Sequence, residues 1–171
     1  MFARCVDRGS AALLLRHAKD RHREEVIKTM AALMQEDERI KPFIARSTAL
    51  VAVPSSLPNR LRRGFDVGAD LAWHLSKSTG LPLHENLLKR RSLRSQRLRK
   101  RREDRFSEHE GFRLKHGSLS GVIGLIDDIS VTNQTVKSAS EALLRAGADE
   151  VWVWTFSKRL NTKTTEALTK E

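Results

Sequence analysis

The stretch "GVIGLIDDISVTNQT", Gly121–Thr135, joins an apolar run to two adjacent acids, Asp127 and Asp128, and then to a polar segment. A short apolar run bounded by polar residues is typical of a buried strand. The sequence that follows ends at Gly147, a residue type that often closes a helix. Its apolar side chains recur at helical spacing, at Val136, Ala139, Leu143 and Leu144. The stretch therefore predicts a strand, a loop and a helix in succession.

Neighbouring segments have the same organisation. Upstream, "STALVAVPSS" is a β-branched run stopped by Pro54, which predicts a buried strand that feeds a loop. A helix is expected next, in "FDVGADLAWHLSKSTG", ending at Gly80 and with a core face made of Val67, Leu71, Trp73 and Leu75. Downstream, "DEVWVWTFS" has bulky residues on both faces, as in a strand covered on both sides. Alternating strands and helices predict an α/β fold with a parallel sheet flanked by helices.

The N-terminal residues 9–37 are predicted to be helical and to flank this sheet. Their core stripe consists of Val26, Ile27, Met30, Leu33 and Met34, and the methionines are interpreted as core fillers. At 171 residues the chain is long enough for one domain with a substantial core. We predict a single domain over residues 1–159, followed by a polar tail over residues 160–171.

The net charge of +11 favours an anionic partner, and most of the excess lies in one segment. Residues 89–105, "KRRSLRSQRLRKRREDR", contain ten basic and two acidic residues, a local net charge of +8. A solvated helix face or loop would explain such a run equally well. No stretch approaches the ~18 apolar residues of a membrane span, so we expect a cytoplasmic protein. The single cysteine, Cys5, excludes a disulfide within the chain.

The acid pair, Asp127 and Asp128, is predicted to lie at the carboxyl end of its strand, where open α/β sheets bind ligands. The next helix offers unpaired N–H groups and a positive dipole end to a phosphate, and Ser130, Thr132 and Thr135 add hydroxyl donors. A ribose 5-phosphate combines a phosphate with hydroxyls that carboxylates accept, and Mg²⁺ can relieve the remaining charge. A single acid here would more simply cap a turn.

These residues resemble a known family. "VIGLIDDISVTNQT" is similar to the phosphoribosyl pyrophosphate motif of type I phosphoribosyltransferases, and "VAVPSSLPNRLRRGFDVGADLA" resembles the signature of the ComF branch, the competence-associated phosphoribosyltransferase-like proteins. The resemblance covers roughly residues 10–159 and extends more loosely to Lys19 and Gln96. Val131 stands where the family has Thr, Asn133 where it has Gly, and Asp66-Val67 where it has Asn-Gln.

The resemblance implies a type I phosphoribosyltransferase-like fold and a Mg²⁺-assisted displacement of pyrophosphate from phosphoribosyl pyrophosphate. Asp127 and Asp128 would bind the ribose hydroxyls, with Mg²⁺ nearby. The 5-phosphate would be cradled by Ser130, Val131, Thr132, Asn133, Gln134 and Thr135. The pyrophosphate would face Arg60, Arg62 and Arg63 in the loop after the first strand. A mobile basic loop would carry Arg90, Arg94, Arg97, Arg99, Lys100, Arg101 and Arg102. The acceptor base is not indicated.

Two alternatives stay open from the sequence. The chain could bind phosphoribosyl pyrophosphate without turnover, or it could be a non-enzymatic nucleic-acid-binding protein. In the second case residues 89–105 would bind single-stranded DNA during uptake. The six histidines show no metal-ligand spacing. Trp73, Trp152 and Trp154 could stack a base, but their apolar surroundings favour core packing.

Overall fold

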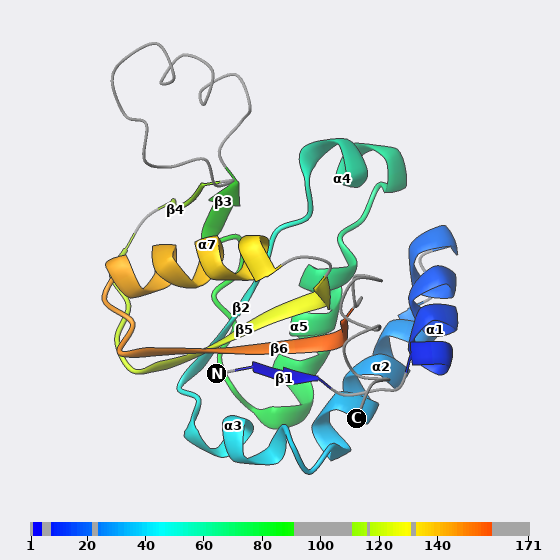
Figure 1. Cartoon of the computed structure of the whole chain (residues 1–171), viewed down its shortest axis with the longest axis horizontal. Helices are drawn as coiled ribbons and strands as arrows, with labels where there is room; N and C mark the ends of the chain where they lie inside the picture. The colour runs from blue at the N-terminus through cyan, green and yellow to red at the C-terminus, as the bar shows by residue number, and fades with distance from the viewer. Residues whose placement is uncertain are drawn as a thin grey trace, which may run out of the picture.

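A parallel sheet with helices on both faces forms the molecule (Figure 1). The computed structural model describes residues 2–4, 8–21, 24–90, 111–115, 117–130 and 133–158. Within these residues the main sheet has four strands, which are β1 (Phe2–Arg4), β2 (Ala49–Ala52), β5 (Val122–Ser130) and β6 (Glu150–Lys158). Their order across the sheet is β1-β6-β5-β2, and every neighbouring pair is parallel. The predicted α/β class, with a parallel sheet flanked by helices, is confirmed.

The long strands β5 and β6 form the centre of the sheet. They are in register from Val122 opposite Glu150 to Ser130 opposite Lys158. β2 pairs with the other side of β5, and an isolated parallel bridge from Leu50 to Leu83 continues the pairing beyond β2. β1 was not expected from the sequence, because three residues are too short to show an alternating pattern.

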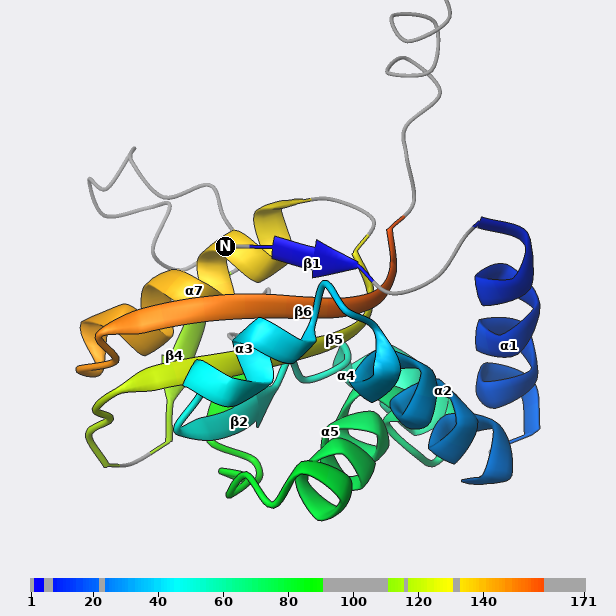
Figure 2. The ribbon, with the colours of Figure 1, turned by 90° about the horizontal axis from the view of Figure 1, so that it is seen from below.

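Helices cover the two faces unequally (Figure 2). One face carries α1 (Arg8–Arg21), α2 (Glu24–Glu36), α3 (Lys41–Arg46) and α5 (Val67–Thr79). The other carries α7 (Asn133–Arg145) and the antiparallel hairpin of β3 (Leu88–Arg90) and β4 (Phe112–Leu114). The strands are therefore apolar on both faces, as the bulky alternation in β6 predicted.

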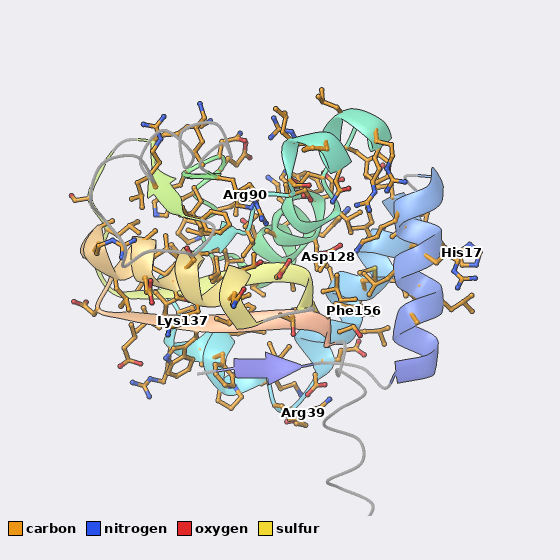
Figure 3. The ribbon with its side chains drawn as sticks, turned by 45° about the horizontal axis from the view of Figure 1, so that its top comes forward. His17, Arg39, Arg90, Asp128, Lys137 and Phe156 are labelled. Atoms are coloured by element: carbon orange, nitrogen blue, oxygen red, sulfur yellow. The ribbon has the colours of Figure 1, made fainter. Side chains whose placement is uncertain are left out.

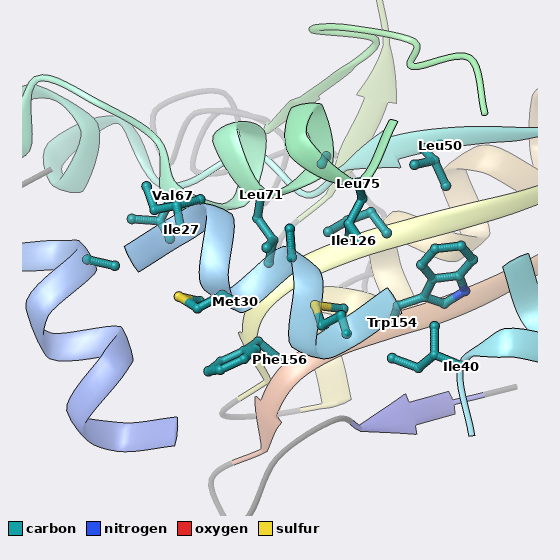
Figure 4. Packing of buried hydrophobic residues seen from close by; sticks show 14 of the residues in the cluster. Ile27, Met30, Ile40, Leu50, Val67, Leu71, Leu75, Ile126, Trp154 and Phe156 are labelled. Carbon is teal, nitrogen blue, oxygen red and sulfur yellow. The ribbon is translucent and has the colours of Figure 1, made fainter. Parts of the chain in front are cut away.

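The larger core lies between the sheet and the helices α1, α2 and α5 (Figure 4). This core includes Ile27 and Met30 of α2, Leu71 of α5 and the fully buried Trp154 of β6. Gly124 of β5 makes room for this packing. A Cβ there would lie 2.7 Å from Leu50 and 3.1 Å from the Trp154 ring, so any larger residue would force the two side chains apart.

Several predicted core positions proved to be exposed. Trp73 is 43% exposed and packs against Lys77 at its ring face, so the core interpretation of this residue was wrong. Leu144 and Leu33 are also exposed, at 46% and 38%. All three lie at the margin of an apolar stripe, where the helix turns its side chains away from the neighbouring layer.

The N-terminal region predicted to be helical, residues 9–37, contains the two helices α1 and α2. One predicted loop differs in the structure. The segment after β2, predicted as a loop, contains the short helix α4 (Leu57–Arg63). A proline in its first turn and Gly64 at its carboxyl end, with φ of 80°, define its limits.

Candidate functional site

The acid pair lies where β5 loses one of its two neighbours. β2 pairs with β5 only as far as Ile126, whose carbonyl accepts a final hydrogen bond from the Val53 N–H at 2.8 Å. β6 stays paired as far as Ser130, so the strand continues three residues past the first acid instead of ending there. Asp127 and Asp128 therefore follow directly after the point where the pairing with β2 ends, near the carboxyl end of β2, the kind of position at which α/β sheets bind ligands.

Asp127 is buried, with 8% of its surface exposed, and it lies opposite Thr155 of β6. Burial raises the pKa of the Asp127 carboxyl well above its usual range, and the neighbouring Asp128 carboxyl raises it further by repulsion and by a hydrogen bond between the two side chains. The charge of Lys19 and the Asp128 backbone N–H act in the opposite direction. These effects together make the Asp127 carboxyl harder to ionise than an exposed aspartate.

Asp128 is engaged through both of its carboxylate oxygens. Oδ1 accepts a hydrogen bond from the Ile129 N–H at 2.8 Å, and Oδ2 is 2.6 Å from the ammonium of Lys19 on α1. Figure 3 shows Asp128 on the strand and His17 on the outward side of α1. Lys19 was singled out in the sequence only through a loose resemblance, and no local pattern connects it with an acid 109 positions away.

The residues predicted to cradle a phosphate are divided between three places. Ser130 is the last residue of β5, and Val131 and Thr132 lie outside the described residues. Asn133, Gln134 and Thr135 form the first turn of α7, so the helix begins two residues earlier than expected. First-turn N–H groups lack intrahelical acceptors and carry the positive end of the helix dipole. The acid pair and these donors are thus joined by only a few residues.

The three predicted pyrophosphate-binding arginines lie in the last turn of α4. Arg60 and Arg62 are exposed, and Arg63 is half-buried. The α4 excursion, residues 54–66, leaves the sheet directly after Val53. Its two ends are joined by Asp66, whose carboxylate accepts hydrogen bonds from the Ser55 N–H at 2.9 Å and the Ser55 hydroxyl at 2.8 Å.

Arg90 connects the β3-β4 hairpin to Pro54, at the start of the segment that carries α4. Its Nε donates to the Pro54 carbonyl at 3.4 Å, and its guanidinium lies 5.0 Å from the centre of the Phe112 ring. Neither contact was predicted from the sequence. The other residues of the predicted mobile basic loop lie outside the described residues, and these are Arg94, Arg97, Arg99, Lys100, Arg101 and Arg102.

The two carboxylates of the acid pair provide only part of the oxygen ligands that a hard cation needs. Two carboxylates provide oxygen ligands of the type that Mg²⁺ prefers, but no group of three His, Cys, Asp or Glu residues that could hold a metal occurs among the described residues. Magnesium commonly binds to one or two carboxylates together with substrate phosphates and water. The site therefore fits a Mg²⁺ ion that arrives with a phosphate-bearing ligand.

No helix in the described part of the chain is long and apolar enough to cross a membrane. Neither a protein-family model nor a curated protein matches the sequence.

Solved structures similar to this chain include a synthetase and a transferase. One is a phosphoribosylpyrophosphate synthetase from Mycobacterium smegmatis, with 16% identity and a TM-score of 0.46, over 84% of this chain and 37% of the synthetase. The other is a purine phosphoribosyltransferase from Pyrococcus horikoshii Ot3, with 12% identity and a TM-score of 0.41, over 92% of this chain and 87% of the transferase. This chain thus spans little more than a third of the synthetase.

Proposed function

We propose that this chain binds phosphoribosyl pyrophosphate with Mg²⁺ and acts as a phosphoribosyltransferase of ComF type. The observation that carries the proposal is the position of the acid pair on β5, just past the end of the β2 pairing and within a few residues of the first turn of α7. A ligand at this position meets carboxylates and helix N–H groups at the same time. A sugar phosphate has both a hydroxyl edge and a phosphate to match them.

In this arrangement Asp127 and Asp128 accept hydrogen bonds from the 2- and 3-hydroxyls of the ribose. The 5-phosphate lies at the amino end of α7, near Gln134 and Thr135. In this proposal the arginines of α4 approach the pyrophosphate. The start of their segment supports this, because it follows Val53, whose N–H donates to the carbonyl of Ile126, the residue before Asp127. Guanidinium groups suit this role because their planar fork holds phosphate oxygens in pairs.

The transfer itself requires little acid–base chemistry. The bond from the anomeric carbon to pyrophosphate breaks, pyrophosphate leaves with the electron pair, and the acceptor forms the new bond to carbon. Protein groups need mainly to position the sugar and stabilise the charge that develops on the leaving group. When bound, Mg²⁺ supplies further charge neutralisation at the phosphate oxygens.

Calorimetric titration of phosphoribosyl pyrophosphate, with and without Mg²⁺, tests the proposal. We expect saturable, Mg²⁺-assisted binding by the wild type. Asp128→Asn removes the carboxylate charge and should weaken binding roughly 10- to 100-fold, the value of a charge-assisted hydrogen bond. Glu36→Gln, an exposed position at the far end of α2, is the matched control and should bind as the wild type does. Equal affinities for all three proteins would refute the proposal.

Turnover is tested separately from binding. Release of pyrophosphate should be followed with phosphoribosyl pyrophosphate and a panel of purine and pyrimidine bases, because the acceptor is not indicated by the described residues. Base-dependent release in the wild type and its loss in Asp128→Asn would support an enzyme. Tight binding with no release from any base would instead support the alternative of a binding protein without turnover.

A further inference from the structure

Lys19 is held at the acid pair by the packing of its helix. Leu15 and Ala18 are the inward residues of α1, at 4% and 0% exposure, and they belong to the core formed with α2 and β6. Lys19 lies one turn after Leu15, on the same side of the helix as that residue. Its side chain is 21% exposed and that of Asp128 is 14% exposed, so the 2.6 Å ion pair is largely withdrawn from solvent.

Such a pair differs from an ordinary surface salt bridge, which contributes little and is easily exchanged. An ammonium group has three N–H donors and is strongly hydrated in water. One carboxylate oxygen accepts from only part of this donor set and replaces only part of the hydration. The remaining donors can serve a second acceptor at the same place. A partly buried cation next to a carboxylate therefore favours a ligand that adds negative charge.

The position of Lys19 relative to the sheet indicates which part of a ligand it meets. α1 packs against the core on the α2 and α5 face, whereas α7 packs against the opposite face with Ile123 and Leu125 of β5. Figure 2 shows α7 across the sheet from α2 and α5, with α1 at the end of the sheet. The amino end of α7 and the ammonium of Lys19 thus flank the acid pair from different sides.

Resting on the proposed function, we propose that Lys19 is a ligand-binding residue that donates to the pyrophosphate group of phosphoribosyl pyrophosphate. The 5-phosphate occupies the α7 side, and the anomeric substituent reaches the α1 side. Asp128 and Lys19 then recognise adjacent parts of one molecule, a hydroxyl and a pyrophosphate oxygen. This predicts selection of phosphoribosyl pyrophosphate over ribose 5-phosphate, which lacks the second charged group.

The test uses Lys19→Met, with Lys28→Met on the exposed face of α2 as the control for the same loss of charge. Each protein is titrated with phosphoribosyl pyrophosphate and with ribose 5-phosphate in the presence of Mg²⁺. We expect Lys19→Met to weaken phosphoribosyl pyrophosphate binding roughly 10- to 100-fold and to leave ribose 5-phosphate binding within about twofold. The control should match the wild type with both ligands.

Two results would overturn the inference. Unchanged affinity for phosphoribosyl pyrophosphate would show that Lys19 does not reach it, and an equal loss for both ligands would assign Lys19 a role in holding Asp128 in place. If wild type binds and Asp128→Asn does not, an unaffected Lys19→Met refutes this inference alone. If the wild type itself fails to bind, the proposed function has failed.

A measurement on the wild type does not depend on the folding of a variant. Amine acylation followed by mass spectrometry reports the accessibility of Lys19, with Lys28 as an internal reference. Phosphoribosyl pyrophosphate with Mg²⁺ should protect Lys19 more strongly than ribose 5-phosphate does. Equal protection by the two ligands would contradict a contact with the pyrophosphate.

Discussion

Replacing Asp127 by asparagine should make the empty protein more stable while removing ligand binding. Asp127 accepts a hydrogen bond from the Asp128 backbone N–H and shares a second one with the Asp128 side chain. An asparagine has the same shape, an acceptor oxygen and an NH₂ donor, so it reproduces both contacts without a titratable proton. The substitution thereby removes the free-energy cost of burying a carboxyl group that can ionise.

The sign and size of this effect follow from the pKa of Asp127. An aspartate in the unfolded chain titrates near 3.9, and burial raises its pKa in the folded protein. The stabilisation that the Asp127 carboxyl gives the folded state is therefore complete below about pH 4. It is lost as the pH rises through the raised pKa of the folded protein. Each unit of difference corresponds to about 1.4 kcal/mol, and each kcal/mol to about 2–4 °C in melting temperature for a domain of this size.

Thermal melts from pH 4 to pH 8 test the reasoning, with Glu36→Gln as the exposed control. Asp127→Asn and wild type should melt together at pH 4, and the variant should melt at a higher temperature than the wild type at pH 8. Its affinity for phosphoribosyl pyrophosphate should fall roughly 10- to 100-fold, because a neutral amide is a weaker acceptor than a carboxylate. A variant that is destabilised equally at every pH would refute the reasoning.

Further predictions concern packing, the α4 excursion and proton exchange. Gly124→Ala should lower the free energy of unfolding by about 1–3 kcal/mol, measured by denaturant titration, because its Cβ collides with Leu50 and Trp154; an unchanged midpoint would contradict the packing. Asp66→Ala should remove both hydrogen bonds to Ser55 and increase proteolysis of the α4 segment, while the melting temperature falls by only a few degrees. Cleavage at the wild-type rate would show that these hydrogen bonds do not hold the segment in place. Binding to the acid pair should release protons at neutral pH and grow stronger as the pH rises, since the ligand favours two carboxylates. Calorimetry in two buffers of different ionisation enthalpy measures the number of protons released on binding, and proton uptake would contradict the prediction.

Much of the fold could be predicted from local sequence. The apolar run before Asp127 is β5, the β-branched run before Pro54 is β2, and the positive φ of Gly80 ends α5 as its position indicated. Errors occurred at the margins of apolar stripes, as at Trp73, in short elements such as β1, and at element boundaries such as the carboxyl end of β5. Three residues carry too little pattern to distinguish a strand from a loop.

The candidate site was less predictable than the fold. The acid pair and the first turn of α7 could be placed from the sequence because they lie within one strand-loop-helix unit. The hydrogen bond between Arg90 and the Pro54 carbonyl could not, since it joins segments 36 residues apart. Arg60 and its neighbours were named correctly as a cluster but were placed in a loop where the chain forms a helix.

The sequence by itself determined the succession of strands and helices, the parallel class of the sheet and the place of the two acids along the chain. These follow from periodicity, turn residues and the alternation of elements, all of which are local properties. Only the tertiary structure decided that β2 leaves β5 at Ile126, that burial raises the pKa of Asp127 and that Lys19 pairs with Asp128. Solvent exclusion and ion pairing depend on which surfaces meet across the core, and residues distant in the chain determine that.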